Sequence, residues 1–340
     1  MPDILENVSL KPYNTFGLEA KGKYFVVFKS VEELKGILSL EKFKNEKKLF
    51  LGGGSNVLLM GDFDGLVLKN EIFGIENIFE DETKVILKSG AGEVWHLFVS
   101  KSIELGLSGL ENLSLIPGTV GAAPMQNIGA YGVEIKDVFV ELEALNLETF
   151  EIEIFDKEKC NFGYRESYFK HEGKGKYVIL NVSFELSKIP NFNVSYGAIK
   201  DTLHQMGVVD LTTKAISDAV ISIRKSKLPD PAQIGNSGSF FKNPEIPKTN
   251  YDTLKEVFPN MPHYVIDAES VKVPAGWLIE QAGWKGKRIG EIGVHTQQAL
   301  VLVNYGGGKG HEIANLAYEI QASVLEKFGI KITPEVNFIE

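Results

Sequence analysis

Apolar and polar positions alternate with period two along two long stretches of the chain. Residues 138–155 read VFVELEALNLETFEIEIF, and residues 177–187 read YVILNVSFELS. Such alternation is typical of antiparallel strands that have one face in water. Shorter strand-like runs bounded by glycine occupy residues 64–70 and 84–92. The sequence therefore predicts a substantial content of β-sheet.

Helical periodicity marks four further segments. Ser30 and Glu33 form a predicted capping box for a short helix that continues to Leu38. A second helix is predicted over residues 94–105, with an apolar face made of Val94, Leu97, Phe98 and Leu105. The remaining predictions are helices at residues 212–226 and 310–328, a linker at 189–203 and a terminal strand within 330–340. Together these elements indicate a mixed α+β fold.

The stretch Leu115–Val133 reads LIPGTVGAAPMQNIGAYGV and fits neither a helix nor a strand. Its four glycines stand among small or amide-bearing residues. Glycine lets the backbone approach a ligand where a Cβ would collide, and successive N–H groups can form an anion-binding concavity. The stretch therefore predicts a loop that cradles a cofactor. The alternative is a glycine-rich connection that only turns corners.

A second glycine turn, GGGSN at residues 52–56, lies between two short strand-like runs within residues 47–59. Its backbone can supply consecutive donors to a pyrophosphate, and the alternative is a glycine-rich hairpin. Two such turns in one chain favour a shared dinucleotide ligand. A P-loop and a Rossmann fingerprint are both excluded, because Tyr24 and Val57 occupy positions that these motifs reserve for other residues.

Composition and charge narrow the class of protein. The 340 residues are 44% hydrophobic and 24% charged, which is ordinary for a soluble globular chain of two or three domains. A net charge of -9 argues against general nucleic-acid binding. The single Cys160 permits no internal disulfide, and six dispersed histidines offer no metal-ligand cluster. We expect a cytoplasmic protein, because signal-peptide and membrane-span patterns are absent from the sequence.

Three side chains are candidates for catalysis. Arg165 lies between two tyrosines in GYRESYFK, where its planar guanidinium suits an oxyanion, and a structural ion pair is the alternative. Ser239 precedes two phenylalanines and lacks a GxSxG elbow, so proton transfer suits it better than nucleophilic attack. Glu335 lies in TPEVNF, where a strand glutamate usually faces water. Lys227 and Asn243 suit anionic substrate groups, with a solvated surface role as the alternative.

Nine motifs, taken in order, resemble the UDP-N-acetylenolpyruvoylglucosamine reductase family. They span nearly the whole chain and are NTFG, LGGGSN, IPGTVGAAPMQNIGAYG, GYRES, KLPDP, GNSGSFFKNP, AGWLIEQAG, VHTQQALVLVN and PEVNFI. A single motif of this kind recurs in related flavoproteins, whereas nine in register are specific. The length and the SYGAI segment with Tyr196 are similar to the longer subclass, in which a tyrosine loop closes over the diphosphate.

The resemblance implies an α+β fold of the vanillyl-alcohol-oxidase type that binds FAD without a covalent bond. It implies FAD-binding subdomains at residues 1–70 and 71–208, with a strand at about 330–340 returning to the flavin site, and a substrate-binding domain at 209–329. The cofactor-binding positions that it implies are Gly52, Gly53, Gly54, Ser55, Asn56, Pro117, Gly118, Thr119, Gly121, Ala122, Gln126, Asn127, Gly129, Ala130, Tyr131 and Gly132.

The same resemblance implies roles for the candidate side chains. Arg165 matches the arginine that polarises the substrate, Ser239 the serine acid, and Glu335 the carboxylate near the C-terminus. The implied substrate-binding positions are Tyr196, Lys227, Asn243 and Gln298.

The implied activity is the reduction of UDP-N-acetylglucosamine enolpyruvate by NADPH through FAD, in peptidoglycan precursor synthesis. The substrate and NADPH are the expected partners, and we expect a monomer that binds neither nucleic acid, membrane nor metal. Two alternatives stay open at this point: a flavin oxidase that uses oxygen, and a flavin-binding module without catalysis.

Overall fold

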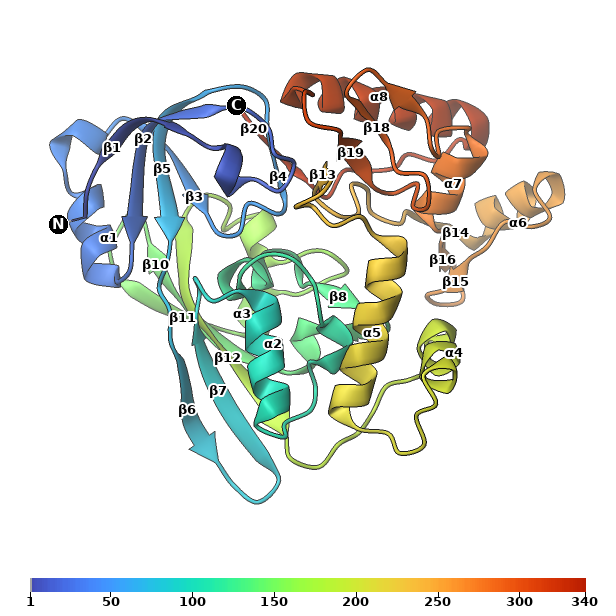
Figure 1. The fold of residues 1–340 in the computed structure, drawn as a ribbon, viewed down its shortest axis with the longest axis horizontal. Coiled ribbons are helices and arrows are strands. Elements are labelled where there is room, and N and C mark those ends of the chain that lie inside the picture. The colour runs from blue at the N-terminus through green and yellow to red at the C-terminus, as the bar shows by residue number, and fades with distance from the viewer. Residues whose placement is uncertain (1) are drawn as a thin grey trace. The chain divides into compact units, whose positions relative to one another are not determined.

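The computed structural model describes residues 2–340 and divides into two compact units (Figure 1). Unit 1 contains the described residues up to Val8, then Gly22–Gly53 and Asp64–Ser226. Unit 2 contains Ser9–Lys21, Gly54–Phe63 and Lys227–Glu340. The chain passes from unit 1 to unit 2 inside the predicted glycine turn, between Gly53 and Gly54. The three-part division of the chain implied by the family resemblance stays a prediction.

The first sheet of unit 1 has four strands in the order β1-β2-β5-β3. Its strands are β1 (Leu5–Ser9), β2 (Lys21–Phe28), β3 (Lys47–Leu51) and β5 (Phe63–Asn70), and helix α1 is Val31–Leu38. Apolar residues of α1 pack against alternate residues of β2 and β5, because one face of each element is apolar. Ser30 caps α1 as predicted, by accepting from Glu33 N at 3.1 Å. The Glu33 carboxylate accepts from Lys29 N instead of Ser30 N, one residue earlier than a capping box requires.

The second sheet of unit 1 has five strands in the order β11-β10-β12-β7-β6. These are β6 (Ile75–Glu80), β7 (Lys84–Gly90), β10 (Phe139–Asn146), β11 (Ile152–Asp156) and β12 (Tyr177–Ser187). β10 pairs with β11 and with β12 in antiparallel fashion, which confirms the prediction made from period-two alternation.

Helix α2 (Trp95–Glu104) packs on this sheet, but the predicted apolar face was wrong. Val94, Leu97 and Leu105 are exposed, and only Phe98 of the predicted face is buried. The buried face also contains Trp95, whose ring lies edge-on to Phe184 of β12 with centroids 5.8 Å apart. The buried residues of α2 follow the helical repeat i, i+3, i+4, i+7 from Trp95, whereas the prediction counted from Val94, which precedes the helix.

The rest of unit 1 includes the Leu115–Val133 loop and several short elements. It consists of α3 (Lys157–Cys160), α4 (Gly197–Gln205), α5 (Thr213–Lys227), the short strands β8 (Gly129–Ala130) and β9 (Val133–Glu134), and 3₁₀ turns at Glu41–Phe43, Glu111–Leu113, Val120–Ala122, Pro124–Gln126, Ile135–Asp137 and Tyr168–Lys170. α4 and α5 share an apolar cluster that includes Ile199 and Ile216. The predicted linker at residues 189–203 is therefore wrong in its second half, which is helical.

Unit 2 contains a four-stranded sheet in the order β13-β19-β18-β17, a three-stranded sheet in the order β14-β16-β15, and the parallel pair β20-β4. Its elements are Lys11–Tyr13 (3₁₀), β4 (Val57–Leu59), β13 (Gly235–Asn236), β14 (Glu245–Pro247), α6 (Lys248–Val257), β15 (Tyr264–Val265), β16 (Ser270–Lys272), α7 (Ala275–Gln281), β17 (Arg288–Ile289), β18 (Ile292–Val294), β19 (Leu302–Asn304), α8 (Gly310–Phe328) and β20 (Asn337–Ile339). Helix α8 begins and ends where the sequence predicted.

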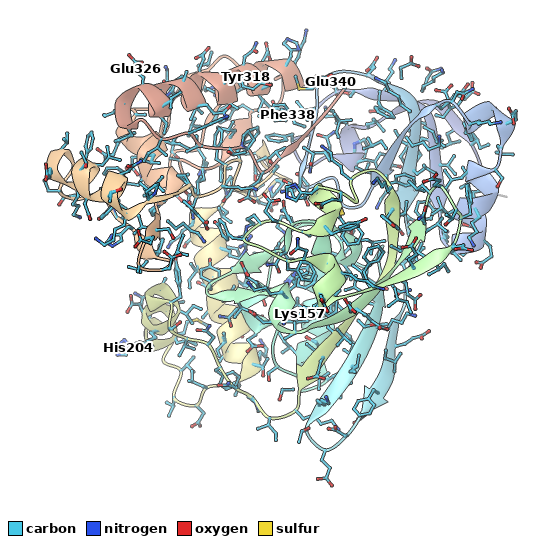
Figure 2. The ribbon with its side chains drawn as sticks, turned by 180° about the vertical axis from the view of Figure 1, so that it is seen from behind. Lys157, His204, Tyr318, Glu326, Phe338 and Glu340 are labelled. Atoms are coloured by element: carbon cyan, nitrogen blue, oxygen red, sulfur yellow. The ribbon has the colours of Figure 1, made fainter. Side chains whose placement is uncertain are left out.

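The C-terminal strand β20 lies beside the strand that leaves the glycine turn. β20 pairs in parallel with β4, with Asn337 opposite Val57. Figure 2 labels Phe338 of β20 and Tyr318 of α8, whose ring centroids are 6.1 Å apart. Because β3 pairs with β5 and β4 pairs with β20, the hairpin alternative for residues 47–59 is wrong.

Candidate functional site

The two predicted cofactor turns touch each other within unit 1. A Cβ added to Gly53 would lie 2.9 Å from the Cα of Gly118, and one added to Gly52 would lie 2.5 Å from Thr119 Oγ1. The atoms near Gly53 belong to the Gly118 backbone, so a side chain at Gly53 would force the turns apart. Glycine is therefore required here so that one turn can pack against the other. That both turns bind one ligand stays a prediction.

The glycine turn presents unused backbone donors. Among residues 2–340, the N–H groups of Gly53, Gly54 and Ser55 donate no hydrogen bond to another residue. Gly54 has a φ of +62°, a left-handed conformation that glycine adopts without strain. Successive N–H groups in such a turn form a concavity that suits an anion. The residues present thus fit a phosphate-bearing cofactor such as FAD.

Side chains from neighbouring helices fix the start of the Leu115–Val133 loop. Leu115 N donates to His96 Nδ1 at 3.0 Å, and Arg224 Nε donates to the Leu115 carbonyl at 3.2 Å. Burial lowers the pKa of His96, and the charges of Lys225 and Arg224 lower it further. A neutral imidazole is required for this contact, because Nδ1 accepts the Leu115 proton.

The middle of the loop is held by Asn127 and Arg165. Asn127 Nδ2 donates to Glu134 Oε2 and to the Gly163 carbonyl, both at 3.0 Å. One guanidinium nitrogen of Arg165 donates to the Gly129 carbonyl at 2.6 Å. Arg165 also has a left-handed backbone, with φ 56°, a conformation that costs a non-glycine residue about 1–3 kcal/mol. The structure thus brings Arg165 against the predicted cofactor loop at an energetic cost.

Ser239 and Glu335 lie on adjacent segments of unit 2. Glu335 N donates to the Phe240 carbonyl at 2.8 Å, and Phe241 forms an antiparallel bridge with Pro334. The residue before Phe240 is Ser239, whose side chain is exposed. The structure therefore brings together two predicted catalytic residues that are far apart in the sequence.

Aromatic packing fixes the segment that carries Ser239. The Phe240 ring is fully buried and lies 5.1 Å from Phe241, 6.1 Å from Phe338 and 6.3 Å from Phe16, measured between centroids. On the other side, Gly238 N donates to Asn236 Oδ1 at 2.9 Å. Ser239 thus lies between two anchored neighbours, which limits the positions its hydroxyl can reach.

The glycine turn also contacts the Glu335 segment within unit 2. Asn56 Nδ2 donates to the Glu335 carbonyl at 3.2 Å, and Asn337 N donates to the Asn56 carbonyl at 3.0 Å. A predicted cofactor residue and a predicted catalytic residue are therefore neighbours through hydrogen bonds.

The predicted substrate positions fall into separate places. Asn243 Oδ1 accepts from Ala275 N at 2.9 Å, at the start of α7. Gln298 Oε1 lies beside the next residue, 3.2 Å from where a Cβ on Gly276 would be. Lys227 is exposed at the end of α5. Tyr196 lies against Tyr131 in unit 1, as described below. Asn243 and Gln298 thus meet at one end of α7.

The sequence missed Arg224 and His96, the two side chains that hold the start of the loop. Arg224 follows the buried residues Val220 and Ile223 on α5, so it lies at the margin of an apolar helix face. A positively charged residue at the edge of an apolar helix face was the only indication in the sequence. It did not reveal that Arg224 bonds to Leu115, which is more than a hundred residues away.

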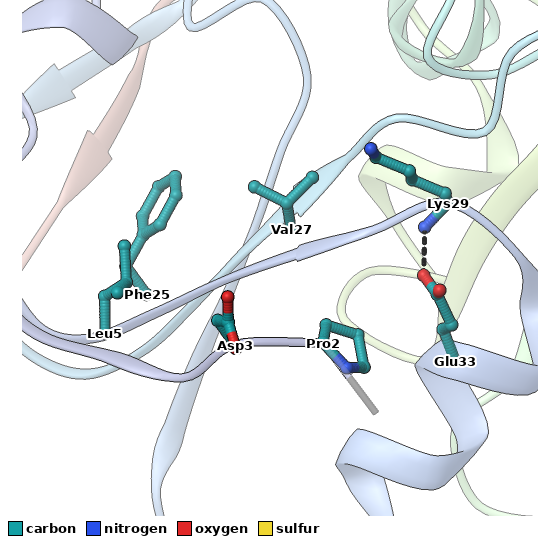
Figure 3. A pocket seen from close by; sticks show the side chains of 7 residues that line it. All are labelled: Pro2, Asp3, Leu5, Phe25, Val27, Lys29 and Glu33. Atoms are coloured by element: carbon teal, nitrogen blue, oxygen red, sulfur yellow. Dashed lines mark hydrogen bonds between the residues drawn. The ribbon is translucent and has the colours of Figure 1, made fainter.

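A cavity of about 300 Å³ elsewhere in unit 1 contains none of the predicted site residues (Figure 3). It is lined by Pro2, Asp3, Leu5, Phe25, Val27, Lys29 and Glu33. Within residues 2–340, no group of three or more His, Cys, Asp or Glu side chains is arranged to hold a metal ion. No helix in that range is long and apolar enough to cross a bilayer.

Known proteins resemble this chain along its whole length. Residues 22–149 match an FAD binding domain, and residues 230–339 match the C-terminal domain of UDP-N-acetylenolpyruvoylglucosamine reductase. The enzyme of that name from Flavobacterium johnsoniae is 54% identical over 99% of this chain and 100% of the relative. The one from Amoebophilus asiaticus is 51% identical over the same shares of the two chains.

A solved structure supports the fold. The crystal structure of UDP-N-acetylenolpyruvylglucosamine reductase (MurB) from Thermus caldophilus aligns with a TM-score of 0.66, at 22% identity, over 100% of this chain and 99% of that one. The predicted α+β fold with an FAD-binding part is thereby confirmed. With relatives of about 50% identity along its full length, the chain belongs to the UDP-N-acetylenolpyruvoylglucosamine reductase family.

Proposed function

We propose that this flavin oxidoreductase uses NADPH and FAD to reduce UDP-N-acetylglucosamine enolpyruvate to UDP-N-acetylmuramate, in peptidoglycan precursor synthesis. The full-length match to reductases of this family carries the proposal. Bound FAD would supply the hydride chemistry by accepting hydride from NADPH and passing it to C3 of the enolpyruvyl double bond. The backbone donors of Gly53–Ser55 and the Leu115–Val133 loop would hold this cofactor without a covalent bond.

Arg165 is proposed to bind the carboxylate of the enolpyruvyl group. Hydride addition at C3 leaves negative charge at C2 that spreads into this carboxylate, so a fixed cation lowers the barrier. The bond from Arg165 to the Gly129 carbonyl orients the guanidinium plane before substrate arrives. Removing one preorganised donor to a developing anion costs about 10²- to 10³-fold in kcat, and a similar loss is expected here.

Ser239 is proposed to protonate C2, with Glu335 assisting by hydrogen bonding to the carboxylate when Glu335 is protonated. A serine hydroxyl is a weak acid, so this role requires a strongly basic carbanion-like acceptor. Support comes from the adjacent strand segments that bring Ser239 and Glu335 together. The UDP portion of the substrate is proposed to bind through Tyr196, Lys227, Asn243 and Gln298.

Two half-reactions separate the roles. In anaerobic stopped flow, NADPH should bleach the flavin absorbance, and the enolpyruvyl UDP-sugar should restore it. Ser239→Ala should leave reduction by NADPH nearly unchanged and slow reoxidation by about 10²- to 10⁴-fold. Ser237→Ala is the matched control, because Ser237 is buried two residues away and its Oγ has no hydrogen-bond partner within residues 2–340.

Other outcomes contradict the proposal in different ways. Equal losses in both half-reactions would remove the proton-donor role from Ser239. Reoxidation by air as fast as by the UDP-sugar would indicate an oxidase. A colourless protein without affinity for FAD would contradict the whole assignment. We also propose that the protein is a cytoplasmic monomer. Light scattering of the purified holoenzyme tests its oligomeric state.

A further inference from the structure

Arg224 joins the two ends of the Leu115–Val133 loop, and all of the contacts involved lie within unit 1. Its Nε donates to the Leu115 carbonyl at 3.2 Å, and its guanidinium also hydrogen-bonds to the Tyr131 hydroxyl. The loop between these two residues contains most of the implied cofactor positions. One side chain thus fixes both the entry and the exit of the predicted cofactor loop.

The charge of Arg224 has no carboxylate partner. No ion pair to this guanidinium occurs within residues 2–340, although the side chain is partly buried. Burial lowers the pKa of Arg224, and the nearby Arg165 lowers it further. Burying a cation without a carboxylate partner costs free energy. We therefore look for a role of Arg224 at Tyr131 other than stabilising the fold.

Tyr131 itself is held in an unusual conformation. Its φ is 50°, in the left-handed region that non-glycine residues rarely adopt. Asn112 Nδ2 donates to the Tyr131 carbonyl at 3.1 Å and to the Asn193 carbonyl at 2.9 Å. Asn193 Nδ2 in turn donates to the Gly132 carbonyl at 3.1 Å. The segment that leads to Tyr196 is therefore bonded to the backbone around Tyr131.

The rings of Tyr131 and Tyr196 complete this contact. Their centroids are 5.4 Å apart and their planes meet at 85°, which is a favourable edge-to-face arrangement. Tyr196 immediately precedes α4 and is 40% exposed, whereas Tyr131 is half-buried. Tyr196 is thus the more exposed of the two rings, and Tyr131 is the ring whose backbone is bonded to its surroundings.

We propose that Tyr131 is a positioning residue that docks Tyr196 for binding of the UDP-sugar, and that Arg224 holds the Tyr131 ring in place. The inference rests on the proposed function, in which Tyr196 contacts the diphosphate. It links the cofactor loop to the substrate segment, because one residue belongs to both contacts. Tyr131 then affects substrate affinity only through Tyr196.

A double-mutant cycle tests this dependence. The dissociation constant of the enolpyruvyl UDP-sugar is measured by calorimetry on oxidised holoenzyme for wild type, Tyr131→Leu, Tyr196→Leu and the double variant. Edge-to-face pairs of this kind correspond to about 2- to 12-fold in affinity, so Tyr131→Leu should weaken binding by that factor. In the Tyr196→Leu background the same change should have almost no effect.

A conservative variant distinguishes docking from general damage. Tyr131→Phe keeps the ring and loses only the bond to Arg224, so most of the affinity lost in Tyr131→Leu should return. Tyr24→Leu is the matched control, because Tyr24 and Phe43 form a similar pair elsewhere in unit 1, 5.3 Å apart at 66°. That variant should lower stability and leave the dissociation constant of the UDP-sugar unchanged.

A measurement without substrate covers the case of a poorly folding variant. Hydrogen exchange of the α4 amides in the holoenzyme should be faster in Tyr131→Leu than in Tyr24→Leu, and Tyr131→Phe should return it most of the way to the wild-type rate. Additive losses in the cycle, no rescue by phenylalanine, or unchanged α4 exchange would each overturn the docking role alone. A wild-type holoenzyme that fails to bind the UDP-sugar would overturn the proposed function, and the docking role with it.

Discussion

Gly53→Ala isolates the contact between the two cofactor turns. The new Cβ would lie 2.9 Å from Gly118 Cα, 3.3 Å from its carbonyl carbon and 3.6 Å from its nitrogen. All three atoms are backbone, so no side-chain rotation can relieve the contact. Gly53 does not have a positive φ, and alanine can therefore adopt its backbone conformation. The substitution tests packing between the turns and leaves backbone strain out of the comparison.

The expected loss follows from this geometry. Carbon atoms are in optimal contact at about 3.5–4.0 Å, so the turns must separate by roughly 0.6–1 Å. Overpacking of this size typically costs about 1–3 kcal/mol. If that cost falls on the cofactor-binding conformation, the dissociation constant of FAD should rise by about 5- to 150-fold, since 1.4 kcal/mol is roughly a factor of ten.

Titration of FAD into apoprotein, followed by quenching of flavin fluorescence, measures this constant. Gly61→Ala and Gly36→Ala are matched controls, because a Cβ at either position meets nothing within 4 Å. Both should bind FAD like the wild type, and Gly36→Ala should gain up to about 1 kcal/mol of stability because it lies inside helix α1. A Gly53→Ala protein with unchanged FAD affinity would refute the role of turn-to-turn contact in shaping the cofactor site.

Two further predictions concern buried titratable groups. The folded state lowers the pKa of His96 below its ordinary value of 6.5. The contribution of His96 to the free energy of unfolding should therefore be fully present above pH 6.5, and it should be lost as the pH falls from there through the lowered pKa. In urea unfolding between about pH 5 and 8, His96→Asn, which keeps an acceptor for the loop, should flatten this decline, and His311→Asn on the exposed face of α8 should leave it unchanged. Cys160 is fully buried and burial raises its pKa to about 12, so Ellman's reagent should titrate no thiol in the native protein and one in denaturant; rapid native reaction would contradict its placement.

Elements set by local patterns were predicted well. Helix α8 begins at Gly310 and ends at Phe328 as expected, because buried residues repeat at helical spacing and Gly329 ends the helix with a φ of 67°. The antiparallel pairing of β10 with β11 and β12 followed from alternation. The face of α2 was wrong because the prediction counted the repeat from Val94 instead of Trp95, and successive helix residues lie about 100° apart around the axis.

Pairings between distant segments could not be predicted from spacing. The sequence of residues 47–59 does not show that β3 pairs with β5 and β4 with β20. In the second pair, Val57 lies opposite Asn337, which is 280 residues further along the chain. The bonds of His96 and Arg224 to Leu115 depend on how α2 and α5 pack, which is a property of the folded unit. Family resemblance supplied the roles of the catalytic candidates, and the structure added the contacts that hold Arg165 and the segments of Ser239 and Glu335.

The glycines show why the motif indicated a cofactor site before its geometry was known. Gly118 and Gly132 have φ values of 115° and 81°, which other residues rarely adopt, so the turn shape requires them. Gly53 and Gly121 are required for a different reason: a Cβ would collide with Gly118 or with Ala91, at 2.9 Å and 2.5 Å. Neither requirement involves a ligand directly. Glycine-rich turns therefore indicate a cofactor here because tight, mutually packed turns leave backbone N–H groups without protein partners, and an anionic cofactor is the ligand that such groups bind.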